Sequence, residues 1–165
     1  MSAVGPGAHE TAHETAQAFI DAIVWGEHLK IWDLLSIDAR EYVLAAASRK
    51  GMDAVAIERG RQGTWNGDEA DIFLRSLVHG LRVDLSGVDL DQLVVTSEPR
   101  ILENGDLRFE LECLSTLPDA LTGGANWAAG AVIVCSLPVA DLEGPPQVEW
   151  RVQRLVPRPA TRPAS

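Results

Sequence analysis

The sequence is poor in lysine, cysteine and tyrosine, and each shortage narrows the choice of function. Its 165 residues include two lysines, two cysteines and one tyrosine, and 14 basic against 24 acidic side chains give a net charge of −10. Because the basic residues are also scattered, we expect no nucleic-acid partner. No apolar run approaches the roughly 18 residues of a membrane-spanning helix, so we expect no membrane partner. Two cysteines are too few for a cysteine zinc site, and we predict no metal.

The remaining composition is that of one globular domain. Hydrophobic residues make up 46% and charged residues 23% of the chain, which is enough apolar surface for a core without metals or disulfides. The opening MSAVGPGAHE has no basic segment followed by an apolar one, so we expect a cytoplasmic protein. Cys113 and Cys135 lie in apolar runs, and we interpret them as buried thiols. The chain has neither a Rossmann nor a Walker glycine pattern, and we predict no cofactor.

The two ends differ in composition from the body of the chain. Residues 1–8 contain Gly5, Pro6 and Gly7, and the last ten residues, VPRPATRPAS, contain three prolines and two arginines. We therefore predict a disordered N-terminus over residues 1–8, a single domain over residues 9–156 and a disordered tail over residues 157–165.

Apolar residues in the first half of the chain recur at helical spacing. The pattern predicts five helical segments, which begin near Ala12, Leu29, Ser36, residue 52 and Asn66. Gly26 ends the first segment, Ser36 caps the third, and Glu69 completes a capping box with Asn66. The side chains expected to face inward on the second, third and fifth segments are Leu29, Trp32, Leu35, Ala39, Val43, Ala46, Ile72, Phe73, Leu77 and Leu81.

The second half changes to a period of two, which is typical of strands. Four extended runs are predicted, over residues 93–102, 107–115, 127–138 and 148–156. Asn104-Gly105 joins the first two, since both residues tolerate the positive φ of a type I′ hairpin turn. Helices followed by hairpin-linked strands indicate an α+β fold, in which the helices pack on one face of a curved four-stranded antiparallel meander.

Alternation along the second and fourth strands separates an apolar face from a charged face. Phe109 and Trp150 belong to the apolar faces. The charged faces carry Arg108, Glu110, Glu112 and Arg151. We predict that the apolar faces point toward the helices, because burying several charges requires complete pairing. The alternative is the reverse orientation, which would enclose these four charged residues in a pocket, with a glutamate held by arginine as general base.

Tryptophan is unusually frequent, with five residues against one tyrosine and three phenylalanines. Where helices close over a sheet, such side chains line either an apolar ligand pocket or an ordinary core. The candidate ligand-binding residues are Trp25, Trp32, Tyr42, Phe109 and Trp150. Of these, Tyr42 supplies the hydroxyl expected to point into a cavity.

His9-Glu10-Thr11-Ala12-His13 matches the HExxH pattern of zinc metalloproteases. A catalytic zinc needs a third protein ligand and a substrate cleft, whereas this motif lies near the first residue and inside a tandem AHET-AHET repeat. We interpret the pattern as a product of the repeat. The alternative is weak binding of nickel or zinc by the histidine pair.

Two segments resemble the ketosteroid-isomerase-like, or nuclear-transport-factor-like, superfamily of cystatin-like α+β cones. AQAFIDAIVWGEHLKIWDLLS is similar to its opening helix pair, and VEWRVQRLVP is similar to its closing strand. The resemblance implies a cone-shaped fold whose members include isomerases, epoxide hydrolases, polyketide cyclases and non-catalytic binding modules. Residues 37–60 depart from it, since they read as helical where the family has a short strand or hairpin. No catalytic residue of the family matches a position of this chain.

These observations favour a non-catalytic module that binds an apolar small molecule or a partner protein, with a homodimer through the outer sheet face as one form of partner. The alternative function is a small isomerase or hydrolase in which Glu110 or Glu112 is the base and Arg108 or Arg151 orients it. The two differ in one structural feature, which is whether these charged side chains are enclosed.

Overall fold

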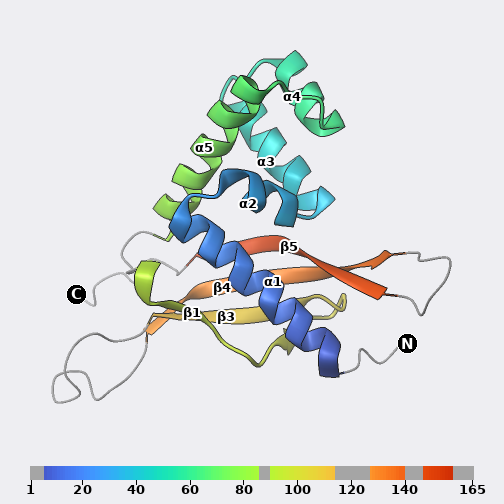
Figure 1. Ribbon diagram of the computed structural model, residues 1–165, viewed down its shortest axis with the longest axis vertical. Helices are drawn as coiled ribbons and strands as arrows, with labels where there is room; N and C mark the ends of the chain where they lie inside the picture. Colours follow the sequence, from blue (N-terminus) through green and yellow to red (C-terminus); the bar gives the residue numbers. More distant parts are fainter. Residues whose placement is uncertain (1–5, 86–89, 114–126, 140–146, 158–165) are drawn as a thin grey trace.

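The computed structural model describes residues 6–85, 90–113, 127–139 and 147–157, with helices first and strands after them (Figure 1). The helices are α1 (Pro6–Trp25), α2 (His28–Leu34), α3 (Ile37–Arg49), α4 (Ala54–Gln62), α5 (Gly67–Asp84) and a 3-10 turn at Leu90–Gln92. None of these helices is both long enough and apolar enough to cross a membrane. Residues 1–5 and 158–165, for which the sequence predicts disorder, lie outside the described ranges.

The strands form one antiparallel sheet, which confirms the predicted α+β class. They are β1 (Leu93–Val95), β2 (Arg100–Ile101), β3 (Leu107–Cys113), β4 (Trp127–Val139) and β5 (Gln147–Pro157). Their order is β1-β3-β4-β5, and β2 also pairs with β3. The run 93–102, predicted to be one strand, is therefore two strands. Pro99 lies between them and has no N–H to donate to β3.

α1 lies across one face of the sheet and contacts β1, β3, β4 and β5 (Figure 1). Its inward stripe follows the predicted spacing, and the side chains on it are at most 1% exposed: Ala12, Ala16, Phe19, Ile20 and Ile23. This stripe packs on the main core, which includes Phe109, Val132 and Val152 of the sheet. Each large side chain buried there stabilises the fold by roughly 1.5–3 kcal/mol.

α1 begins at Pro6, inside the segment 1–8 for which the sequence predicts a disordered N-terminus. Proline is suited to the first turn of a helix because its φ is already helical and the N–H it lacks would have no partner within the helix.

α3, α4 and α5 rise away from the sheet beside β5 (Figure 1). α4 packs on α3, and α5 packs on α2. The helices enclose a second core, whose buried members are Leu44, Ile57, Phe73 and Leu74. Trp32 of α2 joins it, with its ring centroid 5.4 Å from that of Trp65 and 5.8 Å from that of Phe73.

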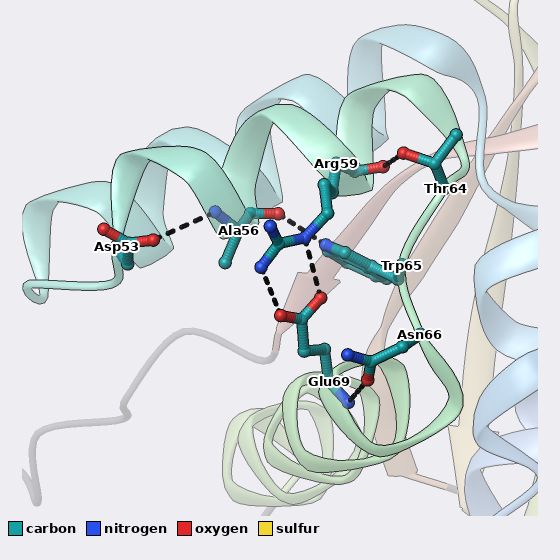
Figure 2. Close-up of polar contacts among 7 residues, drawn as sticks. All are labelled: Asp53, Ala56, Arg59, Thr64, Trp65, Asn66 and Glu69. Atoms are coloured by element: carbon teal, nitrogen blue, oxygen red, sulfur yellow. Dashed lines mark hydrogen bonds and ion pairs between the residues drawn. The ribbon is translucent and has the colours of Figure 1, made fainter.

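Trp65 connects α4 to α5 in this second core (Figure 2). Its indole Nε1 donates a 2.5 Å hydrogen bond to the carbonyl oxygen of Ala56 in α4. Beside it, Arg59 of α4 forms a two-bond ion pair with Glu69 of α5. The hydrogen bonds to Glu69 and the negative charge of its carboxylate raise the pKa of Arg59 above its ordinary value.

The predicted helix ends are largely confirmed. Ser36 caps α3 through a bond from the Ala39 N–H, and Asn66 caps α5 through a 2.8 Å bond from the Glu69 N–H. Gly26 follows α1 with a φ of +71°. The capping box is incomplete, however, because the Glu69 carboxylate binds Arg59 of the neighbouring helix instead of the Asn66 backbone.

Two apolar side chains expected to face inward are exposed. Leu29 is 58% exposed because α2 presents Ile31 to the core instead, and Ile72 is 71% exposed. The buried stripe of α5 runs through Phe73, Leu74 and Val78, so Ile72 lies just outside it.

The β2–β3 hairpin exists, but its turn is not the predicted type I′. Gly105 has a φ of +89°, whereas Asn104, like every other described residue except glycine, has no positive φ. The Gly105 N–H bonds to the Leu102 oxygen at 2.9 Å. The Asn104 side chain accepts from the Asp106 N–H at 3.0 Å, the local bond of an Asx turn.

Candidate functional site

The strands are oriented as predicted, with their apolar faces toward the helices. Phe109 is fully buried and Trp150 is 3% exposed, and both belong to the main core. Arg108 and Glu110 lie on the opposite, outer face of the sheet, where the Glu110 side chain is 50% exposed. The reverse orientation, which would have enclosed the charged residues, is wrong.

The outer face carries ion pairs along single strands. Arg108 Nε donates to Glu110 Oε1 at 2.8 Å, and Arg151 Nη2 donates to Glu149 Oε2 at 2.8 Å. Glu112 also lies on this face, is half-buried and has an interaction of its own. The structure therefore places Glu110 beside an arginine on an open surface, which is not the enclosed setting that the general-base interpretation requires.

Strand register aligns three arginines in one row across the outer face. Arg100 of β2 pairs directly with Arg108 of β3, Arg108 with Ile133 of β4, and Ile133 with Arg154 of β5. We call these four residues the arginine row. Directly paired residues lie on the same face of a sheet, so all four side chains point outward.

Two arginines of the row, Arg100 and Arg154, have no acidic partner among the described residues. Arg100 and Arg154 are exposed, and neither has an ion pair or hydrogen bond from its side chain to another described residue. Arg100 also lies opposite Arg108, and like charges in direct cross-strand pairs are destabilising. The row thus leaves two positive charges unbalanced at its ends.

A small polar cluster joins β4, β5 and the start of α3. A register shift in β5 leaves Gln153 without a β4 partner. Its Oε1 accepts from Ser36 Oγ at 2.6 Å and from Cys135 Sγ at 3.4 Å. Burial, with a smaller effect of the Asp106 charge, raises the pKa of Cys135 above its ordinary value. Cys135 is half-buried rather than buried as predicted, whereas Cys113 is buried.

The five aromatic residues predicted to bind a ligand do not meet. Trp25 and Tyr42 are 79% and 72% exposed, so the prediction that they line a cavity is wrong for both. Trp25 ends α1 at the Gly26 turn, and Tyr42 lies on the side of α3 opposite its packed residues. Trp32 belongs to the second core, while Phe109 and Trp150 lie in the main core.

His13 of the HExxH pattern has a packing role. Its Nε2 lies 2.9 Å from the Val95 oxygen, and its ring packs edge-on against Phe109 with centroids 5.7 Å apart. Among the described residues no three histidine, cysteine, aspartate or glutamate side chains are grouped to hold a metal.

Sequence reasoning missed the arginine row of this surface. The arginine row depends on which residues pair across strands, and no local pattern encodes that register.

Comparison of the chain with protein-family models, curated proteins and solved structures gave no match. The resemblance to the ketosteroid-isomerase-like superfamily therefore stays a prediction.

Proposed function

We propose that this protein is a non-catalytic binding module whose outer sheet face docks an extended acidic segment of a partner protein. The observation that supports this most is the arginine row, with Arg100 and Arg154 unbalanced at its ends. The chain as a whole has a net charge of −10. A cationic row on an otherwise acidic protein favours an anionic partner and steers it to this face.

The spacing of the row suits an extended segment. Three inter-strand steps separate Arg100 from Arg154, which is about 14 Å. Alternate residues of an extended chain are about 7 Å apart, so three alternating carboxylates cover that length. Ile133 lies within the row and offers an apolar contact between the charges. An acidic segment would also relieve the repulsion between Arg100 and Arg108.

The other interpretations have less support. An apolar ligand would need space beside Phe109 and Trp150, and both are packed in the main core. An isomerase or hydrolase would need an enclosed Glu110 or Glu112, whereas Glu110 is exposed and ion-paired. A cytoplasmic location and descent from the ketosteroid-isomerase-like superfamily belong to the proposal as expectations.

The test is fluorescence anisotropy with a labelled short peptide of alternating valine and glutamate, and the same peptide with glutamine for glutamate. The protein should bind the glutamate peptide, more weakly as salt rises, and Arg100→Gln/Arg154→Gln should weaken binding by about tenfold. The control Arg49→Gln/Lys50→Gln removes the same charge at the end of α3 and should leave affinity unchanged. Equal losses in both double variants would contradict the proposal.

Sedimentation equilibrium on the same three proteins separates a second copy from a foreign partner. A monomer supports the proposal. A dimer that dissociates in Arg100→Gln/Arg154→Gln would assign the face to self-association instead, and the hetero-partner proposal would be wrong.

A further inference from the structure

α5 passes the junction of α1 and α2 (Figure 1). A second group of basic side chains lies at this place. An open cleft of about 340 Å³ there is lined by Gly26, His28, Arg75, Val78, His79 and Arg82. This volume is within the range of small-molecule sites, about 300–1,000 Å³. The lining contains two arginines and two histidines, one apolar side chain and no carboxylate.

α5 builds one wall of the cleft from a single stripe. Arg75, Val78, His79 and Arg82 are spaced by three and four residues, which places them above one another on one side of the helix. The opposite wall is the turn between α1 and α2, where Gly26 and His28 lie. The cleft thus lies between α5 on one side and the α1–α2 turn with the start of α2 on the other.

The Arg82 guanidinium is fixed in position before any ligand arrives. Its Nε and Nη2 each donate a 3.0 Å hydrogen bond, to the carbonyl oxygens of Ile23 and Val24 in the last turn of α1. A Cβ at Gly26 would lie 3.4 Å from Nη2, and the φ of +71° at Gly26 also disfavours a side chain. Because Gly26 has no side chain, the N–H groups of Arg82 that point away from α1 stay accessible from the cleft.

The other three polar side chains also present donors. His28 Nε2 lies 2.9 Å from Asp71 Oδ1, which fixes its ring; Asp71 is the acidic neighbour of the cleft but does not line it. Arg75 and His79 have no side-chain hydrogen bond or ion pair to another described residue. The arginines at positions 59, 61, 108 and 151, by contrast, all bind glutamates.

We propose that this cleft binds a small multivalent oxyanion, such as an organic phosphate or a polycarboxylate. Arg75 supplies a guanidinium fork that matches either group, and His79 and the fixed Arg82 add donors from the same wall. Val78 is the one apolar lining side chain, so the ligand is mostly charged. The residues differ from those of the arginine row, and this inference does not depend on the proposed function.

The test is isothermal titration calorimetry of the full chain with pyrophosphate and with citrate at low ionic strength. Binding of either anion should be observed, and Arg75→Gln/His79→Gln should weaken it by about tenfold. Arg61→Gln, which removes an arginine that binds Glu41 and Glu58 on another surface, should leave it unchanged. Thermal melts of each variant establish that it is folded.

The preferred anion identifies the ligand class, because pyrophosphate binding alone indicates a phosphate and citrate binding alone indicates a polycarboxylate. Amide shifts in nuclear magnetic resonance spectra should change at Gly26, Val78 and His79 on titration. No binding of either anion, an equal loss in Arg61→Gln, or shift changes elsewhere on the surface would each overturn the proposal.

Discussion

The indole ring of Trp65 lies directly on the backbone of Gly60. A Cβ at Gly60 would lie 2.0 Å from Cζ2 of Trp65, closer than any two non-bonded carbons approach. Because the ring is also held by its bond to Ala56 and by its contact with Phe73, 4.8 Å between centroids, it has little room to move. The α4–α5 corner therefore requires glycine at position 60.

Gly60→Ala should lower the free energy of unfolding by about 1–3 kcal/mol, as overpacking does in other cores. Gly80→Ala is the matched control, since Gly80 lies within α5 with nothing within 4 Å of its Cβ position. That substitution should stabilise the protein by about 0.5–1 kcal/mol, because alanine is the better helix former. Chemical denaturation measures both, and equal effects of the two substitutions would contradict the packing.

Trp150 should tolerate loss of its indole nitrogen better than loss of its ring. Its Nε1 is buried and has no hydrogen-bond partner among the described residues, and an unsatisfied donor costs about 1–3 kcal/mol. Trp150→Ala should destabilise by about 3–5 kcal/mol because the buried ring is lost. Trp150→Phe should destabilise by clearly less, because it keeps a ring and removes the unsatisfied N–H. Denaturation curves in which phenylalanine is as costly as alanine would show that the nitrogen has a partner.

Ser36→Ala should cost more than the loss of an ordinary helix cap. Ser36 both caps α3 and donates to Gln153, so its removal should destabilise by about 1–2 kcal/mol. Asp53→Ala removes the cap of α4, and because the Asp53 carboxylate makes no second hydrogen bond to a described residue, this substitution should cost less. Equal losses in thermal or urea unfolding would mean that the Ser36–Gln153 bond adds nothing.

The Cys135 thiol should ionise at higher pH than an ordinary cysteine, because burial disfavours the thiolate. Its alkylation by iodoacetamide, followed by mass spectrometry in a Cys113→Ala background, should rise at higher pH than in the denatured chain. Since the unfolded state then loses its thiol proton first, stability should be full below the ordinary thiol pKa and fall as pH rises toward the raised pKa. An alkylation midpoint at or below that of the denatured chain would refute this.

Local patterns predicted much of the fold because they arise within single elements. The alternation around Phe109 determined which face of β3 is buried, and Asn66 marked the start of α5 by capping chemistry. The remaining features depend on contacts between separate elements, which local patterns do not encode. Glu69 binds Arg59 on another helix, and Trp65, in the polar stretch TWNGDE, is packed only because Gly60 lies beneath it.

The candidate sites were less predictable for the same reason. Arg100 and Arg154 are 54 positions apart in sequence, and only the β2-β3-β4-β5 register brings them into one row. The cleft has a partial signal, since Arg75, His79 and Arg82 share a helical stripe. Its other wall is supplied by the turn at Gly26, which no periodicity in α5 could indicate.

The most direct test of the account is a nuclear magnetic resonance titration of the isotope-labelled protein with the valine–glutamate peptide. We predict that amide shifts change on the outer sheet face, at Arg100, Arg108, Ile133 and Arg154, and that these changes are lost in Arg100→Gln/Arg154→Gln. Shift changes confined to other surfaces, or none at all, would contradict the claim that this face is the docking site.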